Sequence, residues 1–187
     1  MTAATINEWV TRAQQGAVEA MSVLYLNHYQ RIYRYLYYRA GDLNTAEDLT
    51  SEVFLKMIQA LPHYRNQDVP FQAWLFQIAR NLAIDHHRKQ AAQPIVEIQE
   101  DLQDGRQPID YTLEVKMTQE SLSQALEALT ADQRDVILLR FIEGMSLAQV
   151  GKVLHKSEDS IKGLQHRALI SLRNELHHQE IGYDSSR

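Results

Sequence analysis

The sequence predicts an all-α protein made of two small helical domains joined by a flexible linker. Three observations favour this fold class. Apolar residues recur at helical spacing, glycine (7) and proline (4) are scarce among 187 residues, and N-cap signals recur along the chain. Residues 90–110 break this pattern, because they hold two of the four prolines, a glycine and a cluster of acids. We therefore expect domains at 1–89 and 119–187 and an acidic linker at 90–118.

The first domain is expected to contain three or four helices. The first long helix spans about 16–40, the second starts at Asn44 and ends before Pro62, and the third starts at Pro70, a residue suited to a first helical position. Apolar stripes along these helices predict a buried core. The aromatic residues assigned to that core are Tyr25, Tyr35, Phe71 and Trp74.

The last third of the chain predicts a helix-turn-helix. Two capping boxes pair a hydroxyl with an amide three residues later, Thr130 with Gln133 and Ser146 with Gln149, and Ser157 is a further N-cap candidate. Only two residues separate the middle helix from Ser157, so a tight turn joins the last two helices. The final helix is basic and amphipathic, as in helices that enter the DNA major groove. Its expected core residues are Ile161, Ala168, Leu169 and Leu172.

Composition excludes several classes of function. Zero cysteines exclude disulfides and cysteine-based zinc sites, and the histidine pairs at 86–87 and 177–178 lack the spacing that places two ligands on one helix face. No apolar run approaches the ~18 residues of a membrane helix. No catalytic motif or glycine-rich phosphate loop occurs. We expect no metal, no cofactor, no enzymatic activity and no membrane insertion, and a cytoplasmic location.

The net charge of −5 argues against tight independent DNA binding. Most of the negative charge lies in residues 90–119, which hold two bases and six acids, and no other part of the chain is strongly basic. Affinity from phosphate neutralisation is therefore expected to be small. The charge indicates a protein that reaches DNA as part of a larger assembly.

Two blocks of sequence resemble the extracytoplasmic-function sigma factors of bacterial RNA polymerase. Residues 46–65, AEDLTSEVFLKMIQALPHYR, and 71–89, FQAWLFQIARNLAIDHHRK, resemble region 2 of that family. Residues 130–173, from TADQRDVILLRFIEGM to GLQHRALISLR, resemble region 4, and the blocks occur in the family's order. The resemblance implies a subunit without a catalytic site that binds core RNA polymerase and directs promoter recognition and DNA melting.

The resemblance also implies which residues would act. Contacts to the β′ clamp of the polymerase would come from one face of the second predicted helix, namely Asp48, Ser51, Glu52 and Lys56. The alternative for this face is a solvated surface with a Glu52–Lys56 pair. Region 4 would meet the β flap. The −10 element would be melted by capture of an extruded base, with Asn81 as the reading group. The full −10 set is Tyr64, Arg65, Ile78, Arg80, Asn81 and Arg88, in which Tyr64 and Ile78 are walls and the arginines bind phosphate.

The −35 element would be contacted by the final helix. The residues expected to contact it are Glu158, Ser160, Lys162, Gln165, His166 and Arg167, with Asp159 beside them. An acidic side chain at the DNA can read cytosine N4. The helix departs from the family pattern at Gly163, which costs ~1 kcal/mol against alanine, at Leu164 and in the turn at His155. We therefore expect weak or unusual −35 contact.

Two other functions remain open at this stage. One is a stand-alone helix-turn-helix regulator whose N-terminal helices sense a ligand or dimerise. The other is a degenerate sigma-like module that binds polymerase or an inhibitor without melting DNA, which the altered final helix favours. Within the sigma-factor interpretation, an anti-sigma factor that covers both DNA-binding faces is a further expected partner.

Overall fold

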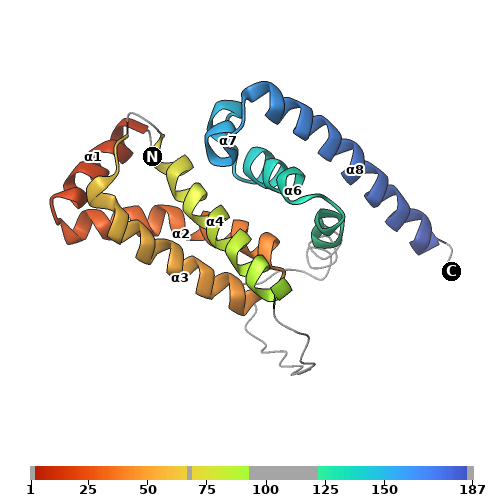
Figure 1. Ribbon diagram of the computed structural model, residues 1–187, viewed down its shortest axis with the longest axis horizontal. Coiled ribbons are helices and arrows are strands. Elements are labelled where there is room, and N and C mark those ends of the chain that lie inside the picture. The colour runs from red at the N-terminus through yellow and green to blue at the C-terminus, as the bar shows by residue number, and fades with distance from the viewer. Residues whose placement is uncertain (1–2, 67–68, 93–121, 185–187) are drawn as a thin grey trace.

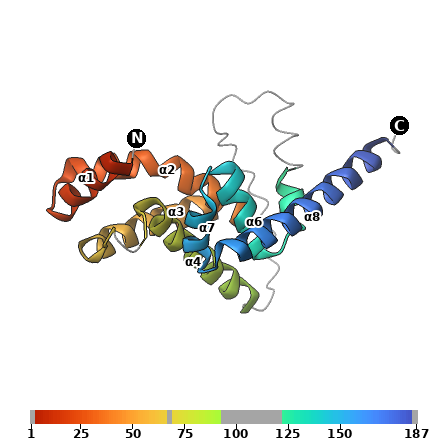
Figure 2. The same cartoon turned by 90° about the horizontal axis from the view of Figure 1, so that it is seen from above.

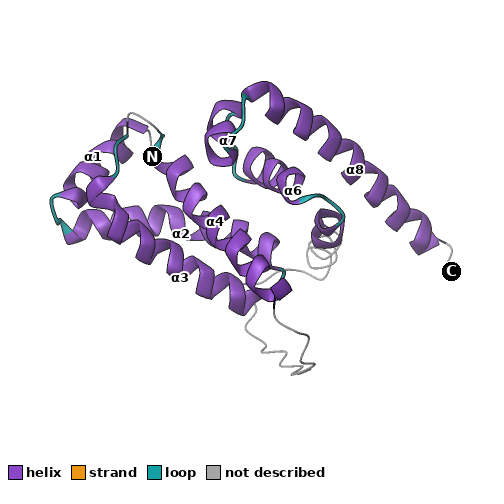
Figure 3. Ribbon diagram, in the orientation of Figure 1, coloured by secondary structure: helices purple, strands orange, loops and turns teal. Residues whose placement is uncertain are grey.

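The structure is a computed structural model that describes residues 3–66, 69–92 and 122–184, and their side chains except at the chain-end residues 3–4 and 176–184. Every regular element in these ranges is a helix, which confirms the all-α prediction (Figure 3). The predicted linker lies outside the described residues apart from residues 90–92, where the last helix of the first half continues. The elements are α1 (Ala3–Gln14), α2 (Val18–Ala40), α3 (Leu43–Ala60), the short η1 (Leu61–His63), α4 (Phe71–Ala92), α6 (Ala131–Ile137), η2 (Leu138–Ile142), α7 (Leu147–Leu154) and α8 (Glu158–Asp184).

The N-terminal domain is a bundle of α1 to α4. Helices α2, α3 and α4 pack on one another, and α1 folds back on α2 (Figure 1). Helix α1 was not predicted, although Ile6, Trp9, Val10 and Ala13 have the spacing of one helical face. Gly16, which has a positive φ, lies in the turn between α1 and α2. Helix α2 begins at Val18, close to the start predicted near residue 16.

Two local predictions in this domain are wrong. The N-cap of α3 is Asp42, whose carboxylate accepts from the Thr45 backbone N–H at 2.7 Å, and not Asn44. Tyr25 is 40% exposed and therefore not a core residue, although its ring packs edge-on against Phe54. Tyr35 and Phe71 are buried and Trp74 packs against the core, as predicted.

The C-terminal domain is built from α6, η2, α7 and α8. Both predicted capping boxes form, at Thr130 for α6 and at Ser146 for α7, and the Ser157 hydroxyl accepts from the Ser160 N–H. His155 adopts the left-handed conformation, with φ 54°, that ends α7. Helix α8 is long and packs against α6 and α7, and its C-terminal end extends beyond the rest of the molecule, as Figure 1 shows. Ile161 and Ala168 are buried on its inner face, whereas Leu169 is 41% exposed, so its assignment to the core is wrong.

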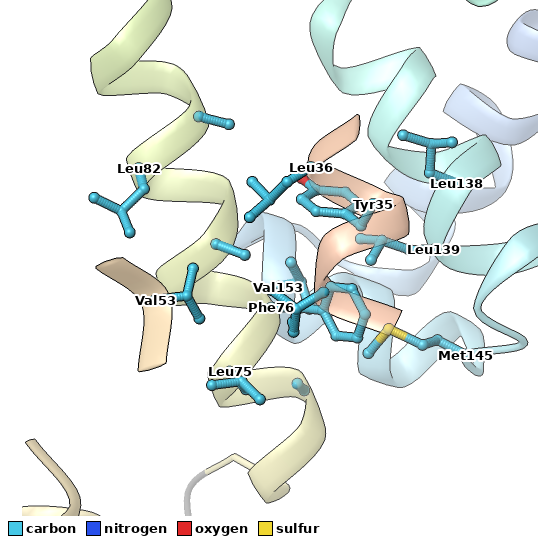
Figure 4. Close-up of a cluster of buried hydrophobic side chains, with 14 of the residues drawn as sticks. Tyr35, Leu36, Val53, Leu75, Phe76, Leu82, Leu138, Leu139, Met145 and Val153 are labelled. Carbon is cyan, nitrogen blue, oxygen red and sulfur yellow. The ribbon is translucent and has the colours of Figure 1, made fainter. Parts of the chain in front are cut away.

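The two domains pack against each other. Helix α7 lies against α4, as seen from above in Figure 2. The short η2 lies against α2. Apolar side chains from both domains meet in one continuous core: Tyr35 and Phe76 of the N-terminal domain face Leu138, Leu139 and Val153 of the C-terminal domain (Figure 4). The interface is therefore part of the folded core and not a loose contact between two surfaces.

Candidate nucleic-acid interface

One face of α3 is polar and accessible. Asp48, Ser51, Glu52 and Lys56 are all exposed on it. The Lys56 ammonium lies 3.5 Å from a Glu52 carboxylate oxygen, and the Ser51 hydroxyl donates to the Glu47 carbonyl at 3.0 Å. An exposed pair of this kind contributes only a few tenths of a kcal/mol to stability, so both side chains are free to exchange partners on docking. The positions of these side chains are compatible with both a polymerase-docking face and an ordinary solvated face.

Tyr64 anchors the loop that joins α3 to α4. Its ring is buried against Trp74 and Phe71, with ring centroids 4.6 Å and 5.7 Å away. Its hydroxyl donates to the Val69 carbonyl at 2.7 Å. Burial raises the pKa of Tyr64 to about 12, so the phenol stays neutral. The side chain therefore fixes the path of the loop and does not present its ring to solvent.

The outer face of α4 carries Asn81 and Arg88, and both side chains are exposed. Ile78 lies one helical turn before Asn81 and is half-buried beside the core. Arg88 pairs with Asp85 at 3.1 Å across one turn. The Asn81 amide is open to solvent, with an apolar side chain on the same side of the helix. This is the minimum that a base-reading site on α4 requires.

Arg80 is held by the C-terminal domain. Its Nε donates to an Asp135 carboxylate oxygen at 2.8 Å, and its Nη2 donates to Asp132 at 2.7 Å. Burial by itself lowers the pKa of the Arg80 guanidinium, but the charge of Asp135 and the hydrogen bond to it raise the pKa above its ordinary value. The predicted phosphate ligand is thus already occupied by two carboxylates.

The outer face of α8 is accessible along its first three turns. Glu158, Asp159, Ser160, Lys162, His166 and Arg167 are exposed there. Gln165 is half-buried, and its amide oxygen accepts from the Arg140 Nε at 3.2 Å. The Lys162 ammonium pairs with Asp159 at 3.0 Å. An open depression of about 510 Å³ runs beside Gly163 and Leu164, which places the two atypical residues within the presented surface.

Three carboxylates of the C-terminal domain were missed by the sequence analysis. Asp135 and Glu143 have fully buried side chains, and Asp132 is partly buried beside them. Glu143 accepts from Arg31 Nε at 2.8 Å and from Arg34 Nη2 at 2.7 Å. All the arginine partners of Glu143 lie on α2, in the other domain. No local pattern identifies such residues, because an acid in an amphipathic helix usually faces water.

Asp135 is the centre of this buried polar network. It accepts from the Tyr35 hydroxyl at 2.8 Å and from Arg80. The Arg39 Nε lies 3.1 Å from Asp135, but its N–H is not aimed at the carboxylate, so this contact is an ion pair without a hydrogen bond. Burial, and then the charge of Asp135, raise the pKa of Tyr35 well above its usual range. The network joins α2, α4 and α6 in one site.

The described side chains contain no group of three His, Asp or Glu residues placed to hold a metal ion. None of the helices in the described part of the chain has the length and apolar character needed to cross a membrane.

Two family profiles match the chain in the order of its two domains. Sigma-70 region 2 matches residues 24–93, and Sigma-70, region 4 matches residues 125–174. The chain is 39% identical over 172 residues to the ECF RNA polymerase sigma factor BldN of Streptomyces coelicolor. This match covers 90% of this chain and 65% of BldN. The chain is 36% identical over 164 residues to the ECF RNA polymerase sigma factor SigX of Bacillus subtilis, and this match covers 84% of each chain.

The fold also has a solved counterpart. The sigma factor RpoE, in a co-crystal structure with the anti-sigma factor NepR from Bartonella quintana, superposes with a TM-score of 0.69. The superposition covers 86% of this chain and 98% of that one at 22% sequence identity. At this identity the likeness establishes a shared fold.

Proposed function

The chain belongs to the extracytoplasmic-function RNA polymerase sigma factors, and on this premise we propose that it binds core RNA polymerase and directs promoter recognition and DNA melting. The observation that supports the proposal most strongly is the helix-turn-helix of α7 and α8, whose outer face is polar and exposed, on a chain that also carries an open reading face on α4. Its partners are core polymerase and promoter DNA, and it acts in the cytoplasm.

The C-terminal domain contacts the −35 element through α8. Lys162 and Arg167 bind phosphates, and the side chains of Gln165 and His166 reach base edges in the major groove. Arg140 holds Gln165 and so orients its amide toward the groove. Glu158 and Ser160, at the start of the helix, add acceptors for a cytosine N4 amine. The same domain meets the β flap of the polymerase.

The N-terminal domain melts the −10 element. Opening DNA costs a few kcal/mol of unstacking, which capture of an extruded base can offset. Asn81 reads that base, Ile78 supplies an apolar contact, and Arg65 and Arg88 hold the adjacent phosphates. Tyr64 supports this site indirectly, because it anchors the loop that leads into α4. Arg80 joins the phosphate ligands once it leaves its two aspartates.

The exposed face of α3 docks on the β′ clamp. Asp48, Glu52 and Lys56 exchange their solvent contacts for charged groups of the polymerase, with Ser51 between them. An anti-sigma protein is a further proposed partner. By covering the DNA-binding faces of α4 and α8 together, it would remove both promoter contacts.

The proposal is tested by run-off transcription with purified core polymerase. Specific transcripts should appear only when the chain is added. Asn81→Ala should lower their yield about tenfold, since it removes a base contact that contributes about 1–3 kcal/mol. The matched control is Asn27→Ala, which changes an exposed asparagine of α2 whose side-chain amide donates to the Val23 carbonyl of its own helix. It should transcribe like the wild type.

Two results would replace this function with another. Tight binding to an operator without polymerase would identify a stand-alone regulator. Binding to polymerase without specific transcripts would identify an interaction module that does not melt DNA. Equal yields from Asn81→Ala and Asn27→Ala would remove Asn81 from the reading site while leaving the sigma activity in place.

A further inference from the structure

Gly163 is a glycine that the fold does not require. It lies inside α8, where glycine is the poorest helix former after proline. Every other glycine in the described ranges has a local reason: a Cβ would lie 2.7 Å from a backbone oxygen at Gly151, and φ is positive at Gly16, Gly41 and Gly144. Gly163 has neither a positive φ nor a crowded environment. Its presence in the helix therefore needs a different explanation.

A side chain at position 163 would meet little of the protein. Apart from the chain neighbours and the helix backbone, the only atom within 4 Å of an added Cβ would be Nη1 of Arg167, at 3.5 Å, which is an ordinary contact. Arg167 is exposed and lies one turn further along α8. Alanine would therefore fit and would favour the helix. Residues that break a local rule in this way are expected mainly at functional sites.

The missing side chain opens a depression on the outer face of α8. Gly163 lies on the side of the helix away from Ile161 and Ala168, which are buried in the domain core. The depression has a volume of about 510 Å³ and is lined by Lys156, Asp159, Ser160, Gly163, Leu164 and Arg167. Glycine is the residue that lets a ligand approach the backbone closely. The depression is thus a place where a partner can come nearer to α8 than a side chain would allow.

The polar groups of the depression fit a phosphate. Arg167 has no ion-pair partner among the described side chains, so its guanidinium can bind two phosphate oxygens with parallel N–H donors. The Ser160 hydroxyl accepts from the Ser157 hydroxyl at 3.0 Å, which leaves its own proton to donate. The other charged side chains that line the depression are already paired, Lys156 with Asp132 at 3.3 Å and Asp159 with Lys162 at 3.0 Å.

We propose that Gly163 is a positioning residue for the −35 contact, because its missing side chain lets one sugar–phosphate unit of promoter DNA enter the depression, where Arg167 and Ser160 bind the phosphate. Phosphate contacts fix the register and orientation of a recognition helix, and base contacts depend on that placement. The glycine thereby brings Lys162 and His166 nearer to the groove. This inference rests on the proposed function. The claim that the fold tolerates a side chain at Gly163 does not.

The test uses the full-length chain with core polymerase and a promoter duplex that the wild-type holoenzyme selects from a randomised pool. Gly163→Leu fills the depression. Asn174→Ala is the control, because it improves helix propensity at an exposed position of α8 and leaves the depression open. At fixed salt, Gly163→Leu should bind the duplex about tenfold more weakly than the wild type, and the control should bind equally well. Both variants should raise the urea midpoint.

A second measurement separates a phosphate contact from other effects on binding. A methylphosphonate, which removes the charge of one phosphate, is placed at each position across the −35 element of the selected duplex in turn. At one position it should weaken binding by the wild type and by Asn174→Ala about tenfold. It should leave the affinity of Gly163→Leu unchanged there, because this variant has already lost the contact.

Three results would overturn the positioning role. Equal affinity of Gly163→Leu and the wild type would show that the depression is not used. A lower urea midpoint for Gly163→Leu would show that the fold requires the glycine. Equal methylphosphonate sensitivity of the two proteins at every position would show that no phosphate enters. If the wild-type holoenzyme selects no duplex, the proposed function fails and this role with it, whereas the urea comparison still reports how well the fold tolerates the side chain.

Discussion

At the scale of single residues, His28 shows how burial changes a titratable group. Its side chain is 3% exposed and meets Phe71 edge-on, with ring centroids 5.3 Å apart. Nδ1 lies 2.8 Å from the Leu24 carbonyl, a geometry in which the protonated Nδ1 donates. Burial lowers the pKa of His28 from its ordinary value of 6.5; the hydrogen bond to Leu24 opposes this shift, and the nearby Arg31 charge adds to it.

This shift predicts a loss of stability in acid. The unfolded chain binds a proton at His28 near pH 6.5, whereas the folded chain binds it only at lower pH. The contribution of neutral His28 to the free energy of unfolding should therefore be complete above pH 6.5. It should fall as the pH drops from 6.5 toward the folded-state pKa. Urea titrations on both sides of pH 6.5 measure it. His28→Leu should lose this part of the decline, and His63→Leu, at an exposed histidine, should keep it.

At the scale of elements, two glycines of the helix-turn-helix should respond to alanine in opposite ways. A Cβ on Gly151 would lie 2.7 Å from the Lys156 backbone oxygen, so the turn between α7 and α8 must shift to accept it. At Gly163, inside α8, the nearest atom would be the Arg167 guanidinium at 3.5 Å, an ordinary contact.

Gly163→Ala should therefore raise the free energy of unfolding by about 1 kcal/mol through helix propensity. Gly151→Ala should lower it by about 1–3 kcal/mol through overpacking. Chemical denaturation of the two variants beside the wild type provides the comparison. A gain at both positions would mean that the turn is more adaptable than its contacts indicate.

The helix ends show how far local sequence predicts structure. Both capping boxes, at Thr130 and Ser146, form as predicted, because a cap depends on residues only three positions apart. The N-cap of α3 was misplaced by two residues, since Asp42 and Asn44 are both good caps and neighbouring residues decide between them. Helix α1 was missed because its apolar stripe is short and occurs in a polar segment.

At the scale of the whole molecule, the shared core predicts cooperative unfolding. The wild type should unfold in a single calorimetric transition, because Tyr35 and Phe76 pack against residues of the other domain. Asp135→Asn leaves the buried charge of Arg39 without its anion and leaves Arg80 with Asp132 alone, and breaking a buried pair costs about 3–5 kcal/mol. The domains should then unfold in two transitions.

Glu127→Gln is the control for this measurement, since Glu127 is exposed on the C-terminal domain. It should retain one transition near the wild-type Tm. A single unshifted transition for Asp135→Asn would indicate that apolar packing alone couples the domains.

At the candidate sites, the sequence predicts which residues are exposed on a single helix but not which residues the other domain covers. The exposure of Asn81, Arg88 and most of the outer face of α8 agrees with what helical periodicity predicts, since periodicity assigns residues to inner and outer faces. Arg80 lies on the same predicted outer face, yet a second domain covers it. Periodicity describes one helix at a time and carries no information about which domain will pack on its polar side.

The all-α class, the two capping boxes and the helix-turn-helix follow from the sequence, because the interactions that produce them act over one or two helical turns. The closed arrangement of the domains depends on contacts such as Tyr35 with Asp135, which are 100 residues apart, and Arg31 with Glu143, which are 112 apart. An acid is stable without solvent only where a cation and donors surround it, and that environment exists only once the chain has folded. The tertiary structure alone therefore turns Asp135 and Glu143 from ordinary helical acids into the buried link between the two halves.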